Sequence, residues 1–294
     1  MLLTKSWKRK CNCAEEFKHK MKTIILTLSL TIGLHQIAIA DDNPKSKESK
    51  PDSAVYLIRY LDVERDNAKE FEEAVSKKTK KFNRSQNSDQ WFTAKILTGP
   101  RTGQYARWFG PKTWADLDKS GSTNTISIDQ GNEELKYWIE NVQPLAKQNT
   151  SLAEIWLTSM GSSYMGLPEN EPTRYIALQR WKMKPGMYQR KAALDKLMVR
   201  AYKEVGLKVN IGVSRLQSGG DYMTFGRWVD FNKWTDYEKT QKWDKIGEAY
   251  DKIYGDGAWK NHLKEHNAIM QENAEVEGEF WEYLEDLSSK ELPK

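Results

Sequence analysis

Residues 105–116 read Tyr105-Ala106-Arg107-Trp108-Phe109-Gly110-Pro111-Lys112-Thr113-Trp114-Ala115-Asp116. The same pattern returns without a gap 120 positions later, as Phe225-Gly226-Arg227-Trp228-Val229-Asp230-Phe231-Asn232-Lys233-Trp234-Thr235-Asp236. Two tryptophans, an arginine and an aspartate keep their register. Upstream of these segments, matching residues are 119 positions apart. The one-residue difference falls in the turns expected at Gly99–Gly103 and Ser218–Asp221, where a change of length is tolerated. The pattern indicates a tandem duplication.

Each copy has the same order of expected elements, strand-helix-strand-strand-helix-strand. Strands are predicted from period-two alternation and helices from apolar residues repeated on one side. The expected strands are 54–61, 91–97, 105–109, 153–159, 174–182, 210–216, 223–229 and 277–284, and the expected helices are 67–82, 133–148, 187–205 and 259–272. The predicted fold class is α+β, with two ferredoxin-like βαββαβ repeats packed sheet to sheet as a single-chain α+β barrel. The expected divisions are 54–160 and 174–288 for the repeats, 161–173 for a linker and 289–294 for a tail.

The start of the second copy carries a resemblance to a known superfamily. Its sequence is Tyr175-Ile176-Ala177-Leu178-Gln179-Arg180-Trp181-Lys182-Met183-Lys184-Pro185-Gly186. It resembles the first strand and turn of dimeric α+β barrel proteins, which include antibiotic-biosynthesis-type monooxygenases, NIPSNAP-like proteins and haem-degrading monooxygenases. The first copy departs from this pattern at 62–66. The resemblance implies a barrel closed by two such modules.

The first 40 residues have the pattern of a secretory signal peptide. An apolar run at 23–34 follows Met21-Lys22, and Ala38-Ile39-Ala40 precedes a polar segment, which predicts cleavage after Ala40. Met21 is an alternative start. The run is short for a membrane anchor, so we expect a periplasmic or secreted protein without a stable anchor and with a flexible tether at 41–53.

Charge and cysteine content exclude several classes of protein. The chain has 46 basic and 41 acidic residues, but beyond Ala40 it has 39 of each. A nucleic-acid partner is therefore not expected. Both cysteines, Cys11 and Cys13, lie in the leader, so the mature chain has no disulfide and no cysteine-based metal site. No hydrolase or phosphate-loop motif occurs.

Strand alternation nominates side chains that face the barrel interior. A pocket with apolar walls and few polar groups suits a small planar organic ligand. Residue types do not decide between an open pocket and a barrel filled by its own rings. The ligand-pocket candidates are Tyr56, Tyr60, Trp91, Lys95, Trp156, Gln179, Trp181, Asn210, Arg227 and Trp228.

Arg107 and Arg227 have two interpretations. Either arginine is able to bind an anionic ligand group through its bidentate fork. Alternatively, each braces its own copy by pairing with Asp116 or Asp236, or by stacking on Trp114 or Trp234. The recurrence of the arginine in both copies favours the brace.

Two histidines remain beyond the leader, His262 and His266, spaced four apart on one helix face. They are candidates for a metal or haem ligand, although no third ligand accompanies them. The expectation is that the protein needs no metal or cofactor, with haem as an alternative.

The leading hypothesis is an exported small-molecule-binding barrel, monomeric, in which the two halves form an internal pseudo-dimer. The resemblance implies cofactor-independent, monooxygenase-like chemistry on a planar substrate if the protein is an enzyme. The alternatives are a non-catalytic exported protein with a filled barrel, and a haem-binding protein.

Overall fold

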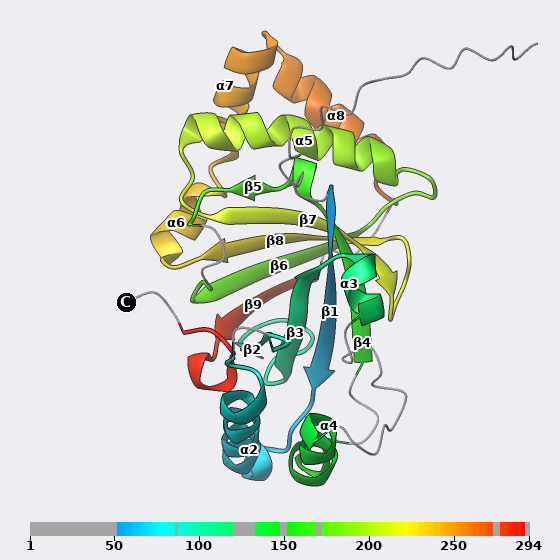
Figure 1. Ribbon diagram of the computed structural model, residues 1–294. Helices are drawn as coiled ribbons and strands as arrows, with labels where there is room; N and C mark the ends of the chain where they lie inside the picture. The colour runs from blue at the N-terminus through cyan, green and yellow to red at the C-terminus, as the bar shows by residue number, and fades with distance from the viewer. Residues whose placement is uncertain are drawn as a thin grey trace, which may run out of the picture. The chain divides into compact units, whose positions relative to one another are not determined.

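The antiparallel strands of the computed structural model close into an eight-stranded barrel (Figure 1). Around the barrel the order is β4 (Leu152–Ser159), β1 (Ser53–Leu61), β3 (Tyr105–Lys112), β2 (Trp91–Ile96), β9 (Glu277–Tyr283), β6 (Tyr175–Lys182), β8 (Thr224–Phe231) and β7 (Asn210–Ser218). β7 then pairs with β4 through Ser214–Thr158, which closes the circle. Closure leaves no free edge among these eight strands. The α+β barrel expected from the sequence is therefore present, while its origin by duplication stays a prediction.

The structure describes residues 52–85, 88–119, 133–147, 152–168, 172–272 and 277–291. These residues belong to one unit, Lys50–Lys294. The predicted leader, its cleavage site and all of the tether but its last two residues lie outside the described residues. Among the helices that are described, none combines the length and apolarity needed to span a membrane.

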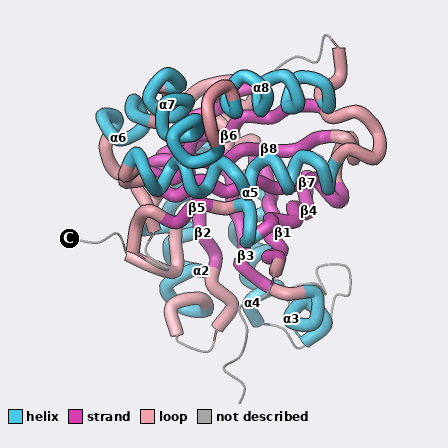
Figure 2. The backbone as a smooth tube through the Cα atoms, turned by 90° about the horizontal axis from the view of Figure 1, so that it is seen from above, coloured by secondary structure: helices cyan, strands magenta, loops and turns pink. Residues whose placement is uncertain are grey.

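Helices cover the outside of the barrel on two sides (Figures 1 and 2). α2 (Ala68–Phe82), α3 (Trp114–Lys119) and α4 (Glu133–Tyr137) follow the strands of the first half, and α4 continues as a π-helical turn, Trp138–Val142. α5 (Tyr188–Val205), α6 (Trp234–Lys239), α7 (Trp243–Tyr254) and α8 (Ala258–Ile269) belong to the second half. Short 3₁₀ helices are Arg65–Asn67, Gln143–Leu145, Met160–Ser162 and Glu285–Leu287.

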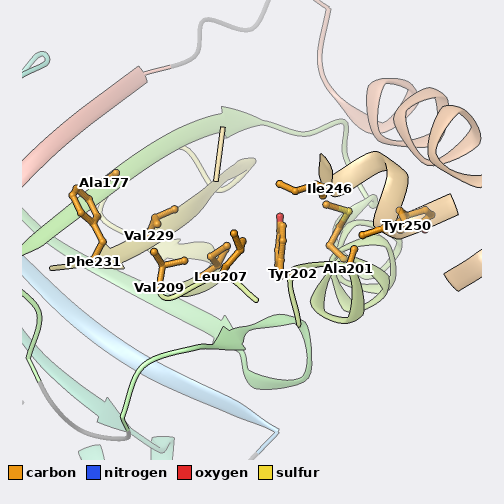
Figure 3. Packing of buried hydrophobic residues seen from close by; sticks show 12 residues of the cluster. Ala177, Ala201, Tyr202, Leu207, Val209, Val229, Phe231, Ile246 and Tyr250 are labelled. Atoms are coloured by element: carbon orange, nitrogen blue, oxygen red, sulfur yellow. The ribbon is translucent and has the colours of Figure 1, made fainter. Parts of the chain in front are cut away.

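The outer face of the second half carries a large apolar core beneath α5 and α7 (Figure 3). Ala201 and Tyr202 on α5 and Ile246 on α7 pack with Val229 and Phe231 of β8. Apolar residues at helical spacing form one face of α5, so burying that face on the sheet is the main source of its stability. A smaller core, containing Phe71, Val75 and Tyr105, joins α2 to the first half.

The structure contains elements that the sequence analysis did not expect. α3, α6 and α7 were not predicted, and the predicted linker 161–173 includes a short strand, β5 (Tyr164–Met165), that pairs with β7. α3 and α6 have six residues each and contain no apolar repeat. β5 has only two residues, and its partner strand supplies the hydrogen bonds that define it. Periodicity is not informative over segments as short as α3, α6 and β5, whereas α7 (Trp243–Tyr254) has twelve residues and was missed despite its length.

Arg107 is a brace in the outer layer of the first half. Its guanidinium donates to Thr93 Oγ1 at 2.7 Å, to the Leu287 carbonyl at 3.0 Å and to Thr79 Oγ1 at 3.3 Å. It also lies over the Trp91 ring at 5.4 Å. These contacts tie β3 to β2, to α2 and to the C-terminal 3₁₀ turn. The predicted partner of Arg107 was wrong, since Asp116 instead accepts hydrogen bonds from Thr113.

Replacing Arg107 by methionine is expected to lower the free energy of unfolding by about 2–4 kcal/mol, because buried hydroxyl and carbonyl groups lose their donor. Urea denaturation followed by circular dichroism measures the loss. Arg59→Met is the control, since Arg59 also lies over Trp91, at 5.5 Å, but is only partly buried. Equal losses in the two variants would show that Arg107 is not the brace.

Candidate functional site

The interior of the barrel brings together five of the ten nominated residues. Tyr60 and Trp156 are buried in the interior cluster, and Tyr56 and Trp228 pack against it. Asn210 occupies the same face of β7 as Leu216, which belongs to that cluster. Ile58, Ile96, Leu178 and Trp281 complete most of the remaining wall.

One end of the interior is closed by a charged network. Arg180 donates to both carboxylate oxygens of Glu154, at 2.9 and 3.0 Å, and to the Tyr60 hydroxyl at 2.7 Å. Tyr60 in turn donates to Glu154 at 2.9 Å. Because β1, β4 and β6 each supply one of these residues, the network joins the two halves of the barrel.

Arg101 adds a second ion pair to the same end. It comes from the turn between β2 and β3, and donates twice to Glu279 of β9, at 2.9 and 2.8 Å. Its guanidinium also lies 3.7 Å from the centre of the Tyr60 ring and 3.5 Å from Glu154. Two guanidinium groups thus face two carboxylates, which leaves no net charge. We call Tyr60, Arg101, Glu154, Arg180 and Glu279 the barrel clasp.

The pKa of Glu154 reflects this environment. Burial by itself raises the pKa of a carboxyl group, but the charge and hydrogen bonds of Arg180, with the indole hydrogen bond from Trp156, hold the pKa of Glu154 below its ordinary value. Glu154 is therefore ionised at neutral pH. Glu279 likewise accepts a hydrogen bond, of 2.9 Å, from the indole nitrogen of Trp281.

The other end of the interior is not filled in the same way. Tyr56, Trp108, Trp228 and Asp230 point inward by alternation with outward-facing neighbours, yet each keeps partial contact with solvent. An inward side chain of a closed barrel meets solvent only through the interior. Solvent therefore reaches this half of the interior, and we call it the open half.

Asp230 is the titratable group of the open half. Burial raises the pKa of its carboxyl from 3.8 to about 7. Within the described residues it has no ion-pair partner. A carboxyl group with a pKa near 7 is able both to accept and to donate a proton at neutral pH. In the recurring segments 105–116 and 225–236, Asp230 corresponds to Gly110, so the two halves differ here.

Tyr56 on β1 of the first half packs against the same interior. Burial raises the pKa of Tyr56, and the charge of Asp230 raises it further. The hydroxyl therefore stays protonated and is a hydrogen-bond donor. Tyr56 and Asp230 together present one donor and one proton acceptor between aromatic walls.

The walls of the open half combine rings with small residues. Phe92 stacks on Trp108 with ring centres 5.7 Å apart, and Trp228 meets Trp156 edge to face at 5.5 Å. A side chain at Gly212 would meet nothing closer than Thr158 at 3.8 Å. The hydroxyls of Thr158 and Ser214 lie 2.6 Å apart. The open half thus combines flat apolar surfaces with small residues.

Four nominated residues face outward instead, which corrects the faces predicted for β2 and β6. Trp91 packs with Phe109 and Leu117, and Lys95 lies over the Tyr105 ring at 3.6 Å. Trp181 stacks on Phe225 at 5.2 Å, and Gln179 accepts a hydrogen bond from Arg227. The faces were predicted wrongly because aliphatic residues were placed under the helices. In the structure the barrel interior contains the aliphatic residues Ala94, Ile96, Ile176 and Leu178. Aromatic rings occur on both faces of the strands.

The tenth nominee, Arg227, also faces outward, beneath α5 and α7, and is buried. Its predicted partner Asp236 pairs with Lys239 instead. The predicted stacking on Trp234 is wrong too, because Arg227 lies over the Trp243 ring at 5.6 Å. Arg227 therefore does not line the open half.

The two histidines belong to the layer of α7 and α8. His262 is buried, its Nδ1 lies 3.2 Å from the Tyr250 hydroxyl, and its ring stacks on Trp259. Burial and the charge of Lys191 lower the pKa of both His262 and His266 to about 4, so both are neutral. Helix packing accounts for the burial of His262, and this packing does not fit an axial ligand. Among the described residues no group of three or more side chains is arranged to hold a metal ion. Haem binding stays a prediction, and we derive no chemical step from it.

The sequence analysis missed Asp230, Arg101 and Arg180. Asp230 could have been predicted, because it lies two positions after the inward-facing Trp228 and is therefore an acidic residue on an otherwise apolar interior face. Arg101 could not have been predicted, because the turn that carries it reaches the end of the barrel only once the strands have closed. The side chain of Arg180 was expected outside the barrel, because the two faces of β6 were predicted the wrong way round.

Comparison with known proteins supports the fold. No family model matches the chain, and no curated protein matches it. A solved structure from Fusobacterium nucleatum, described as a "putative monooxygenase", has a TM-score of 0.51 at 8% identity, over 80% of this chain and 94% of that chain. A second protein with the same description, from Lactobacillus acidophilus, has a TM-score of 0.48 at 9% identity, over 78% and 94%. A haem-binding protein from Thermus thermophilus has a TM-score of 0.43 at 9% identity, over 80% and 92%. These neighbours are of the dimeric α+β barrel type, and at such identities the likeness concerns the fold alone.

Proposed function

We propose that the protein binds a small planar organic molecule in the open half of the barrel. The observation that carries this proposal is the partial solvent contact of inward-facing Tyr56, Trp108, Trp228 and Asp230. Flat rings favour a flat ligand. Tyr56 and Asp230 favour a ligand that carries a hydroxyl or another ionisable group.

The proposed reaction is cofactor-independent oxygenation of such a ligand. Asp230 accepts a proton from the substrate, and the Tyr56 hydroxyl donates a hydrogen bond to the oxygen on which negative charge develops. The substrate anion then reduces dioxygen. A ring carbon that bears hydrogen, which is a methylene in the keto tautomer of a phenol, becomes a carbonyl, one oxygen atom enters the product and the other leaves as water. The substrate supplies all four electrons, so no external reductant is needed.

Binding is tested with 1-naphthol and 2,3-dihydroxynaphthalene as probes. Ligand entry is expected to quench tryptophan fluorescence, because Trp108 and Trp228 line the open half. Gly212→Leu is expected to raise the Kd at least about tenfold, because the larger side chain extends from β7 beside Thr158 and Trp228 and takes the volume that the ligand is proposed to occupy. Gly161→Leu is the control, because a side chain at Gly161 meets nothing within 4 Å and Gly161 lies on the surface. Equal affinities in the two variants would place the ligand elsewhere.

Oxygen uptake with the same probes separates an enzyme from a binding protein. Binding without uptake supports the non-catalytic alternative. Absence of both would show that the barrel has a structural role. The closure of the barrel within one chain supports a monomer, which size-exclusion chromatography with light scattering tests.

Export is proposed from the sequence alone. The apolar run at 23–34 and the Ala38-Ile39-Ala40 site support it. Expression of the full chain followed by N-terminal sequencing of the secreted or periplasmic form is expected to give Asp41 as the first residue.

A further inference from the structure

Arg107 and Arg227 occupy the same position in their halves but differ in what they bind. Each is on the third strand of its half, facing outward, and pairs with the first strand at Arg59 and Gln179 respectively. The Arg107 guanidinium makes three hydrogen bonds within the protein. Arg227 makes one, of 3.4 Å, from Nη1 to Gln179 Oε1. The brace interpretation therefore applies to Arg107 and leaves Arg227 unexplained.

The guanidinium of Arg227 has two buried nitrogens without partners. Arg227 is 7% exposed, and neither Nε nor Nη2 has a hydrogen-bond partner in the structure. These two atoms form one edge of the guanidinium, the edge that binds a carboxylate or another oxyanion in a bidentate manner. Buried polar groups are nearly always hydrogen-bonded. Burial raises the pKa of Tyr202 and a hydrogen bond with Arg227 opposes that rise, so this hydroxyl lies close to the guanidinium, but among the described residues no atom bonds to the Nε–Nη2 edge.

Asp195 of α5 has a complementary unpartnered atom. Its Oδ1 pairs with Lys191, but its Oδ2 is buried without a partner. Burial raises the pKa of Asp195, and the charges of Lys191 and Arg227 oppose that rise, which places Arg227 close to the carboxyl. Neither free nitrogen of Arg227 bonds to Oδ2. A free acceptor and a free double donor thus lie near each other in one buried layer.

Arg227 has no ion-pair partner among the described residues of this layer. Lys191 pairs with Asp195, while the neighbouring histidines His262 and His266 are neutral at pH 7. Tyr202 and Tyr237, which also face Arg227, have raised pKa values through burial and are uncharged. Trp243, whose ring lies 5.6 Å from the guanidinium, is 40% exposed.

We propose that the layer between β8 and α5 is a second binding site, for a small oxyanion that carries a hydroxyl group. The Nε–Nη2 edge of Arg227 binds two oxygens of the anion, and its hydroxyl donates to Asp195 Oδ2. Dihydrogen phosphate and bicarbonate have this chemistry. The site is separate from the open half, because Arg227 and Asp230 face opposite sides of β8.

Calorimetric titration of the full chain with inorganic phosphate at pH 6, at constant ionic strength, tests this site. Binding is expected to be saturable, with one phosphate per chain. Sulfate, which has no hydroxyl at this pH, is expected to bind at least about tenfold more weakly. Lack of saturation, or equal affinity for sulfate, would overturn the proposal.

Three variants locate the site. Arg227→Lys keeps the charge but loses the bidentate edge, and is expected to raise the phosphate Kd at least about tenfold. Asp195→Asn is expected to remove the preference for phosphate over sulfate. Arg107→Lys, at the matching position of the first half, is expected to leave the phosphate Kd within about twofold of wild type. Wild-type affinity in Arg227→Lys, or an equal loss in Arg107→Lys, would contradict the assignment.

The outcome is independent of the proposed function. Arg227→Lys is expected to bind 1-naphthol as the wild type does, since the open half is on the other face of the sheet. Loss of phosphate binding with intact naphthol binding therefore supports the second site. Loss of both by the same substitution would indicate a single site or a folding defect, and would also reject the proposal.

Discussion

Glu154→Gln is expected to lower the free energy of unfolding by about 3–5 kcal/mol, the usual cost of removing one partner of a buried ion pair. The substitution keeps the size of the side chain. It leaves Arg180, which is 9% exposed, facing a neutral amide, and Arg101 with one carboxylate fewer. The clasp then holds two cations and one anion. Because β1, β4 and β6 meet through these residues, the loss weakens the joint between the halves.

Urea denaturation at pH 7 measures this loss. Glu248→Gln is the control, because its ion pair with Lys245 is exposed and solvent screening makes its contribution small. A similar small loss in both variants would show that the clasp contributes no more than a surface pair. Glu154→Gln should also show a smaller loss of stability in acid than the wild type.

The acid dependence follows from the pKa of Glu154. Its folded pKa lies below the ordinary value of 4.5. The folded state therefore binds the proton less readily than the unfolded state, and the stabilisation is complete above pH 4.5. It is lost as the pH falls from there through the folded pKa. A wild-type stability that stays constant through this range would contradict a lowered pKa.

Asp230→Asn is expected to stabilise the protein while abolishing its proton transfer. The shift of the pKa from 3.8 to about 7 corresponds to at most about 4 kcal/mol of unfavourable free energy above pH 7. Partial solvent contact reduces this cost, so we expect a gain of about 2 kcal/mol. Oxygen uptake with 2,3-dihydroxynaphthalene is expected to fall at least about 100-fold, because the proton acceptor is gone.

The pH dependence of the Asp230→Asn effect has a defined sign. The folded pKa is raised, so the wild type is most stable relative to the variant below pH 3.8, and loses that stability as the pH rises towards 7. The stability difference between the two proteins should therefore grow over pH 4–7 and level off above. The control is Asp244→Asn, because Asp244 is an exposed residue of α7. A parallel pH profile for both variants would show that Asp230 is not buried as described.

Much of the barrel was predictable because its elements have strong local signals. The strands Ala54–Leu61 and Arg174–Lys182 and the helices Asn67–Phe82 and Met187–Val205 agree with β1, β6, α2 and α5 to within one residue at each end. Their periodicity spans eight or more residues. The recurrence of Arg-Trp around 107 and 227 placed two strands in equivalent positions. The faces of β1, β4 and β7 were also predicted correctly, since Tyr56, Trp156 and Leu216 meet in the interior.

The candidate site was less predictable, because both faces of the sheet are apolar. Trp91 and Trp156 are rings on strands, but one packs under a helix and the other fills the barrel. When helices cover the outside of a barrel, both faces of its strands are apolar, so the type of a residue does not indicate which face is interior. The hydrogen-bond partners of Arg107, Arg180 and Arg227 are 14 to 180 residues distant in the chain, and no local pattern identifies them.

The amino-acid sequence by itself was sufficient to predict a chain of two similar halves, each with four strands and covering helices, because side-chain periodicity and internal recurrence are local properties. Tertiary structure decided which half of the interior is filled and which is open. It also decided that Asp230 has a pKa near 7 and that Arg227 lacks the partners of Arg107. These properties depend on how strands from opposite halves meet when the barrel closes, and burial and charge at each position arise only from that closure.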